Sequence, residues 1–352
     1  MEYLKSINDK LKKINDTNIQ YLNLFNHPSL VFGNVDKSKV DFHKYSKSIE
    51  EDIRRFGGKA QFFLQYHNTS SCGNRIRFKT TSRKIVLKVQ LKRGYAYKNM
   101  NLWNSSGFDI YIVDNKGNYE SRQLIAPSNK NRIFAEEIWL PPNSSVCIFL
   151  PNYDTIEKMY IGIQLGSRIA NFPYKKNHRK PIVFYGNGIT QGASASKSGN
   201  SFPNIVSRKL DHDIINMSVD NACKATYLAA QNIGKIDCDS IVLDYSRDAN
   251  VLSKFASQYK AFYKFLRDFH PEKKIILMTT VNLNDEKKYH GFDEVIIKTY
   301  EDALKRGENT LLLNQSKLFD QNERDLVTVD NCHYNDFGMY KVADKICELL
   351  NS

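Results

Sequence analysis

An aspartate and a histidine stand three residues apart near the C-terminus, in the run Val329-Asp330-Asn331-Cys332-His333. A histidine can accept a proton from a hydroxyl nucleophile or from water, and a neighbouring carboxylate orients the imidazole and stabilises its cation. Asp330 and His333 are therefore candidate catalytic residues. The alternative is that Asp330 caps the helix that follows and that His333 lies on the surface.

Further candidates follow three apolar runs of the sequence, at 182–186, 213–219 and 240–246. They are the polar residues and one glycine of three loops: Asn187, Gly188, Asp220, Asn221, Asp248 and Asn250. If the aspartates of these loops converge with His333, the cleft is acidic and suits sugar hydroxyls, an amine or a divalent cation. The alternative is that Asp220 and Asp248 are solvated loop residues. Because no helical H-x-x-x-H or carboxylate repeat occurs, we expect no metal and no cofactor.

The elements that position these loops alternate between strands and helices. We expect strands at 182–186, 213–219, 240–246, 274–280 and 309–314, and helices at 201–210, 222–235, 251–268, 292–306 and 336–350. Apolar strands that alternate with helices indicate a parallel sheet with helices on both faces. Sites in such sheets form at the carboxyl ends of the strands, where the candidate loops begin.

The preceding part of the chain has a different pattern. Short β-rich runs between residues 61 and 172, separated by turn signals such as Pro141-Pro142-Asn143, predict an antiparallel β-sandwich. A basic segment with two prolines, 172–181, is the predicted boundary before a domain at 181–352. In residues 1–60, Leu4, Ile7, Leu11 and Ile14 have the spacing of an amphipathic helix, which predicts a helical leader packed on the body or on another subunit.

Charge and cysteine usage exclude several classes of protein. The net charge of the 352 residues is +13, but the lysines are scattered among Asn, Asp and Glu, so we expect no nucleic-acid site. The six cysteines form no C-x-x-C pair, and the sequence has neither a signal peptide nor 18 successive apolar residues. We therefore predict a soluble cytoplasmic protein without membrane insertion, whose ligand is a small molecule, a carbohydrate or a protein partner. An oligomer is possible.

Three motifs, in order, resemble a known family. The segment from Tyr185 to Gly192, Y-G-N-G-I-T-Q-G, is similar to the first block of SGNH/GDSL hydrolases, and the segment from Asp330 to His333 resembles their D-x-x-H block. Upstream, G-F-D-I-Y at 107–111 resembles the G-x-D-L-Y signature of a two-domain branch. The resemblance implies a flavodoxin-like SGNH domain after a β-sandwich, and ester hydrolysis or acyl transfer by a serine–histidine–aspartate mechanism.

The chain departs from the family at three positions. Gly188 takes the place of the nucleophilic serine, and Asn221 takes that of a glycine whose N–H contributes to the oxyanion hole. Asp248 aligns with the oxyanion-hole asparagine, although Asn250 could replace it. An ionised carboxylate about 4 Å from a developing oxyanion opposes it by roughly 4 kcal/mol at an effective dielectric constant near 20.

These departures favour a pseudoenzyme that binds an acylated or carbohydrate-like ligand, or a protein partner. The alternative is an active carbohydrate esterase or O-acyltransferase whose serine at position 188 was mutated or functionally replaced. Two groups could take the place of the serine: a thiolate at Cys223 paired with His333, and water activated directly by His333. A basic module for nucleic acid is the third hypothesis, and it predicts binding that weakens steeply with salt.

Overall fold

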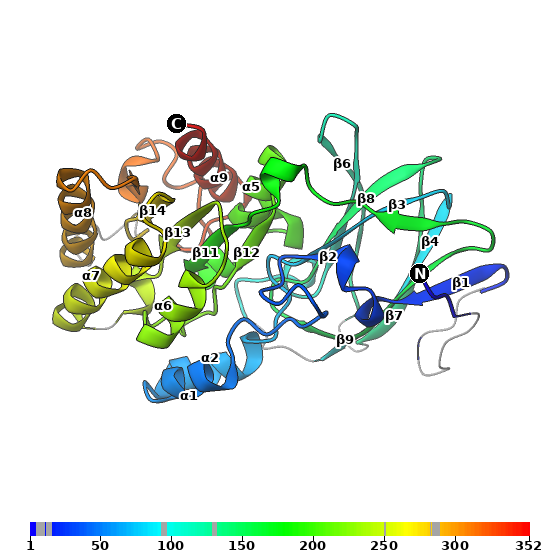
Figure 1. Cartoon of the computed structure of the whole chain (residues 1–352), viewed down its shortest axis with the longest axis horizontal. Helices are drawn as coiled ribbons and strands as arrows, with labels where there is room; N and C mark the ends of the chain where they lie inside the picture. The colour runs from blue at the N-terminus through cyan, green and yellow to red at the C-terminus, as the bar shows by residue number, and fades with distance from the viewer. Residues whose placement is uncertain are drawn as a thin grey trace.

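The computed structural model describes the whole chain except residues 5–10, 12–15, 93–96, 129–131, 250, 282 and 284–288. An antiparallel β-sandwich and an α/β part lie side by side (Figure 1). The chain passes from one to the other between β10 (Ile169–Asn171) and β11 (Ile182–Gly186). The predicted fold class, a flavodoxin-like parallel sheet after a β-sandwich, is confirmed.

The sandwich consists of two sheets. One has the strand order β1-β9-β4-β7, and the other β10-β3-β8-β5-β6 with β2 paired to β3. The strands of the first part of the chain are β1 (Ile19–Asn23), β2 (Val31–Phe32), β3 (Arg75–Thr80), β4 (Lys84–Lys92), β5 (Phe108–Val113), β6 (Tyr119–Ile125), β7 (Ile133–Trp139), β8 (Ser144–Phe149) and β9 (Thr155–Gln164). Their inner faces form one apolar core, to which Ile85, Leu87 and Val89 of β4 contribute alternate side chains.

The α/β part has a five-stranded parallel sheet in the order β12-β11-β13-β14-β15. Its other strands are β12 (Ile214–Asn216), β13 (Ser240–Asp244), β14 (Lys274–Met278) and β15 (Thr310–Leu313). Its helices are α4 (Gly188–Gln191), α5 (Phe202–Leu210), α6 (Tyr227–Gly234), α7 (Leu252–Phe269), α8 (His290–Lys305) and α9 (Asp336–Asn351). Alternate strand residues face opposite layers, as Val183 packs with α6, α7 and α8 and Phe184 with α5 and α9.

The helical leader predicted for residues 1–60 is contradicted at β1 and β2, although residues 47–54 and the residues from 58 onward are helical. Residues 19–23 form β1, which pairs with β9, and residues 31–32 form β2. Ile19 and Tyr21 are buried in one small cluster, whereas Leu22, the residue after Tyr21, packs in the main sandwich core. Side chains that face opposite sides in turn are typical of a strand and not of a helix. Ile7 and Ile14 lie outside the described residues.

Two helices that follow connect the N-terminal segment to the α/β part. They are α1 (Lys47–Arg54) and α2 (Gly58–His67). Ile49, Ile53 and Leu64 are buried in the same core as the α6 side of the parallel sheet. Figure 1 shows α1 and α2 beneath α6, beside the sandwich. The N-terminal segment thereby contributes residues close to the carboxyl ends of the parallel strands.

Candidate active site

Gly188 opens the short helix α4 directly after strand β11. Asn187 caps this helix: its side-chain oxygen accepts the N–H of Ile189 at 2.8 Å, and its amide donates to the backbone oxygen of Asp244 at 2.7 Å. Asn187 is buried, and both ends of its side chain are engaged. It therefore fixes the turn that presents residue 188, and its side-chain oxygen and nitrogen are each engaged in that turn.

The space beside Gly188 is occupied by the carboxylate of Asp220. A Cβ atom at position 188 would lie 2.7 Å from Asp220 Oδ1 and 2.9 Å from its Cγ, much closer than van der Waals contact. Asp220 is held there by Tyr97, whose hydroxyl donates to Oδ2 at 3.0 Å, and by the Asn221 amide, which donates to Oδ1 at 2.8 Å. The carboxylate thus fills the place where a serine side chain would begin.

A buried histidine stands behind Asp220. His67 Nε2 lies 2.7 Å from the Tyr97 hydroxyl, which itself donates to Asp220, so His67 carries its proton on Nε2 and donates to Tyr97. Burial, and secondly the charge of Lys44, lower the pKa of His67 to about 3, which keeps the ring neutral. His67 and Tyr97 are not predictable from the sequence, because neither belongs to a motif and both lie far from residue 220 in the chain.

Burial raises the pKa of Asp220, although the hydrogen bond from Tyr97 and the charge of His333 act in the opposite direction. The Asp220 carboxyl and the His333 ring are therefore near enough to interact electrostatically. His333 and Asp330 form the predicted pair, with His333 Nδ1 2.7 Å from Asp330 Oδ2. Among the described residues, His333 Nε2 has no hydrogen-bond partner, so it can serve a ligand.

Asp330 does not cap α9. Its Oδ1 accepts the N–H of His333 at 2.7 Å, while the side chain of Asn335 caps the helix by accepting the N–H groups of Phe337 and Gly338. The alternative in which Asp330 is a helix cap is therefore wrong. Burial would raise the pKa of Asp330, but the hydrogen bonds from His333 outweigh it and leave that pKa below its usual value.

Asn221 has the backbone conformation expected of a glycine, with φ of +56°. This left-handed region disfavours most side chains, and asparagine tolerates it better than others. Within the described part of the chain, neither the Asn221 N–H nor the Gly188 N–H has an acceptor. Both remain free to donate to a ligand oxygen.

Asp248 ends a short 3-10 turn after β13 and is buried. Its Oδ2 accepts the N–H of Cys223 at 3.0 Å. Burial, with the charge of Asp220 adding to it and that of Lys224 opposing it, raises the pKa of Asp248 to about 8. A raised pKa favours the protonated form of Asp248 near neutral pH, and a protonated carboxyl can donate a hydrogen bond where an ionised one would repel an oxyanion. Asn250 lies outside the described residues.

A thiolate at Cys223 is not available as a nucleophile. The thiol is fully buried beside the Tyr45 hydroxyl, 3.4 Å away, and burial raises its pKa to about 12.

Among the described residues, potential metal ligands come together in the C-terminal loop, where atoms of Asp330, Cys332 and His333 lie within 4.8 Å of one another. The direct bond between His333 and Asp330 satisfies these two ligands without an ion.

No helix in the described ranges is both long enough and apolar enough to cross a membrane.

No protein among the curated sequences matches this chain. Two family models do: the GDSL-like lipase/acylhydrolase model matches residues 179–351, and the model of the GxDLY N-terminus of SGNH-hydrolase-type esterases matches residues 20–169.

Solved structures with the same architecture include three of stated activity or class. A protein from Bacteroides ovatus ATCC 8483 described as a GDSL-like lipase is 24% identical, with a TM-score of 0.79 over 95% of this chain and 98% of that one. The salicylyl-acyltransferase SsfX3 from a tetracycline biosynthetic pathway is 15% identical, with a TM-score of 0.73 over 96% and 95%. A family two carbohydrate esterase from Clostridium thermocellum, in complex with cellohexaose, is 9% identical, with a TM-score of 0.54 over 80% and 92%.

Three findings indicate the same family: the order of the parallel strands, the Asp330–His333 pair and the two family models. The chain belongs to the GDSL-like lipase/acylhydrolase family, in the branch whose SGNH domain follows a GxDLY domain.

Proposed function

We propose that this chain is a pseudoenzyme of its family, which binds an acylated or carbohydrate-type ligand in the cleft between Gly188 and His333 without serine chemistry. The observation that carries the proposal is the Asp220 carboxylate beside Gly188, 2.7 Å from where a Cβ atom would lie. A carboxylate in this place opposes any side chain at position 188, a serine included. It also presents hydrogen-bond acceptors to hydroxyl groups.

The cleft keeps groups that suit such a ligand. The free N–H groups of Gly188 and Asn221 can bind a carbonyl oxygen, and His333 Nε2 can bind a hydroxyl. The carbohydrate esterase with a similar fold binds cellohexaose, which supports a carbohydrate as one ligand class by analogy. The acyl group and the carbohydrate are alternatives within the same proposal, and a protein partner is a third.

The proposal is tested by ester turnover and by labelling with a fluorophosphonate probe, which reacts with activated serines. We expect neither from the natural chain. Gly188→Ser alone is expected to remain silent, because Asp220 occupies the space of the new side chain. Gly188→Ser/Asp220→Ala removes this obstacle, and labelling of the double variant alone would show that the remaining site is competent. Turnover by the natural chain that disappears in His333→Ala would overturn the proposal.

Binding is measured separately, by titration of the natural chain with cellohexaose and with an acetylated cello-oligosaccharide. We expect the chemical shifts of the Gly188 and Asn221 amides to change on saturation. Asp344→Asn, on the exposed surface of α9, is the control and should bind equally. If neither sugar binds, the ligand class is wrong even where turnover is absent.

The alternative is an active carbohydrate esterase or O-acyltransferase in which another group replaces the serine. The intact Asp330–His333 pair favours it, because His333 Nε2 is free to activate water. This candidate predicts hydrolysis of acetyl esters by the natural chain without covalent labelling. Such turnover would be retained in Cys223→Ala, since the buried Cys223 thiol takes no part.

A further inference from the structure

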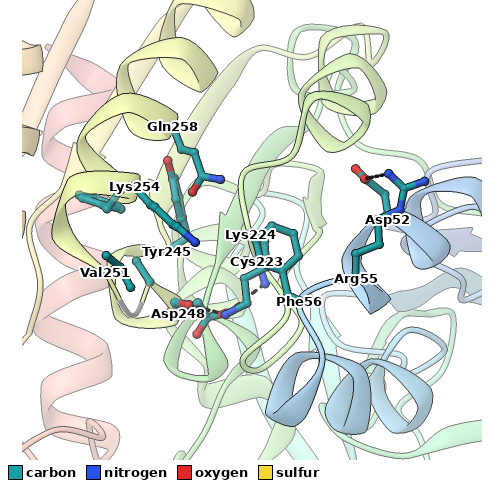
Figure 2. Close-up of a pocket in the computed structure, with 12 residues that line it drawn as sticks. Asp52, Arg55, Phe56, Cys223, Lys224, Tyr245, Asp248, Val251, Lys254 and Gln258 are labelled. Carbon is teal, nitrogen blue, oxygen red and sulfur yellow. Dashed lines mark hydrogen bonds and ion pairs between the residues drawn. The ribbon is translucent and has the colours of Figure 1, made fainter.

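A cavity of about 570 Å³ lies between α1, α7 and the loops after β12 and β13. Phe56 follows α1, Val251 directly precedes α7 and Lys254 lies in its first turn. Lys224 and Asp248 come from the two loops (Figure 2). Asp248 belongs to both places: it is the predicted oxyanion-hole residue, and it lines the cavity. A cavity of this volume is in the range that holds small organic ligands.

Two polar groups that line the cavity are without a partner. Tyr245 is 3% exposed, and its buried hydroxyl has no hydrogen-bond partner among the described residues. Asp248 uses Oδ2 to accept the N–H of Cys223, while Oδ1 has no partner in the part of the chain that the structure describes. A buried hydroxyl without a partner costs free energy, so Tyr245 is expected to bond to a molecule that enters the cavity.

The charge of the lining is positive. Figure 2 shows Lys224 and Lys254 extending toward the space between α7 and the Asp248 loop. Lys224 Nζ donates to the backbone oxygen of Asp248, whereas the Lys254 ammonium has no partner among the described residues. Asp52 is neutralised by Arg55, 3.5 Å away. Two lysines therefore face the cavity, and the carboxyl beside them, Asp248, has a pKa that burial raises.

The remaining wall is apolar. Phe56 and Val251, which line the cavity, are 47% and 48% exposed, whereas Phe255, which also lines it, is buried. Exposed apolar side chains beside lysines and an unpartnered hydroxyl would contact the two ends of one amphiphilic molecule. A carbohydrate has no large apolar portion for these side chains, so this surface differs in kind from the cleft at Gly188.

We propose that this cavity binds a small amphiphilic anion, a carboxylate or a phosphate monoester on an aromatic or short aliphatic group. The oxyanion lies between Lys224 and Lys254 with the Tyr245 hydroxyl as a further donor, and the apolar group lies on Phe56 and Val251. The proposal goes beyond the function proposed for the cleft, because it uses none of the residues that surround Gly188 except through Asp248. Ester turnover by the natural chain would leave it untouched.

The first experiment is calorimetric titration of the full chain with 2-naphthoate, 2-naphthyl phosphate and the uncharged 2-naphthamide. We expect at least one anion to bind about tenfold more tightly than the amide, which corresponds to one charge-assisted hydrogen bond. The stronger of the two anions identifies the head group. If no anion binds, or if the amide binds as tightly as both, the proposal is overturned.

Variants assign the binding to this cavity. Lys254→Gln should weaken the anion about tenfold, whereas Lys260→Gln, an exposed lysine of the same helix outside the cavity, should have no effect. Tyr245→Phe removes a hydroxyl without a partner, so the chain should keep its resistance to urea while the anion binds more weakly. Equal losses in Lys254→Gln and Lys260→Gln would indicate only nonspecific attraction and would overturn the assignment.

Discussion

The side chain of Asp220 limits which residue can stand at position 188. Gly188→Ser places a Cβ atom 2.7 Å from Asp220 Oδ1, and Asp220 is itself fixed by Tyr97 and Asn221. We expect this substitution to lower the free energy of unfolding by about 1–3 kcal/mol, the usual cost of overpacking. Urea denaturation measures the loss. Asp220→Ala in the same chain should relieve it, and an equal loss in the double variant would contradict the argument.

Asp248 gives the stability of the protein a pH dependence. Its pKa is raised to about 8 in the folded chain, where Lys224, Asp220 and Asp244 are the charged groups near it, whereas the unfolded carboxyl titrates at 3.8. The folded state therefore holds the proton more tightly, and stability falls as the pH rises from about 4 to 8. Asp248→Asn keeps the shape without the charge, and it should stabilise the chain by up to about 5 kcal/mol at pH 9 but little at pH 4.

This effect is measured as the difference between the urea midpoints of variant and natural chain at the two pH values. Asp244 is a second buried carboxyl with a raised pKa, of about 7, and it remains in both proteins, so its contribution cancels. A difference that does not change with pH would show that Asp248 is ionised throughout. The Asp248 carboxylate would then repel an oxyanion, as its place in the sequence predicts.

At the scale of elements, the cap of α9 holds the loop that carries His333. The Asn335 side chain accepts the N–H groups of Phe337 and Gly338 and donates to the backbone oxygen of Leu326. Asn335→Ala should cost about 1 kcal/mol, detected by thermal denaturation. Asn335→Asp keeps the cap and loses only the donor, so it should cost less. If both cost the same, the bond to Leu326 and not the cap carries the effect.

The elements of the parallel sheet could be predicted because each has a clear period, and all five strands occur where they were expected. The ends of the elements were less predictable. The sequence pattern predicts a helix from residue 222, but α6 begins only at Tyr227. Asn221 and Ala225 adopt positive φ values of +56° and +49°, which a helix does not allow.

The site residues are predictable only where they lie in motifs. The contact of Tyr97 with Asp220 joins residues 123 positions apart, which no local pattern indicates.

A buried arginine of the sandwich, Arg75, joins it to the α/β part. Arg75 of β3 forms an ion pair with Asp213, just before β12, and donates to the Tyr174 hydroxyl at 2.6 Å. Both charged side chains are almost completely buried. Asp213→Ala leaves the arginine without its partner, so it should destabilise the chain by about 3–5 kcal/mol, measured by urea denaturation. Lys180→Ala breaks an exposed pair and should change little.

The Asp220 carboxylate beside Gly188 also bears on how this sequence can evolve. A lineage that acquires serine at position 188 meets a steric conflict before it gains a nucleophile, and one that first shortens Asp220 empties a filled space without gaining any chemistry. Neither first step offers an advantage that selection could retain. For the pseudoenzyme that we propose, a serine nucleophile at position 188 therefore requires two mutations together.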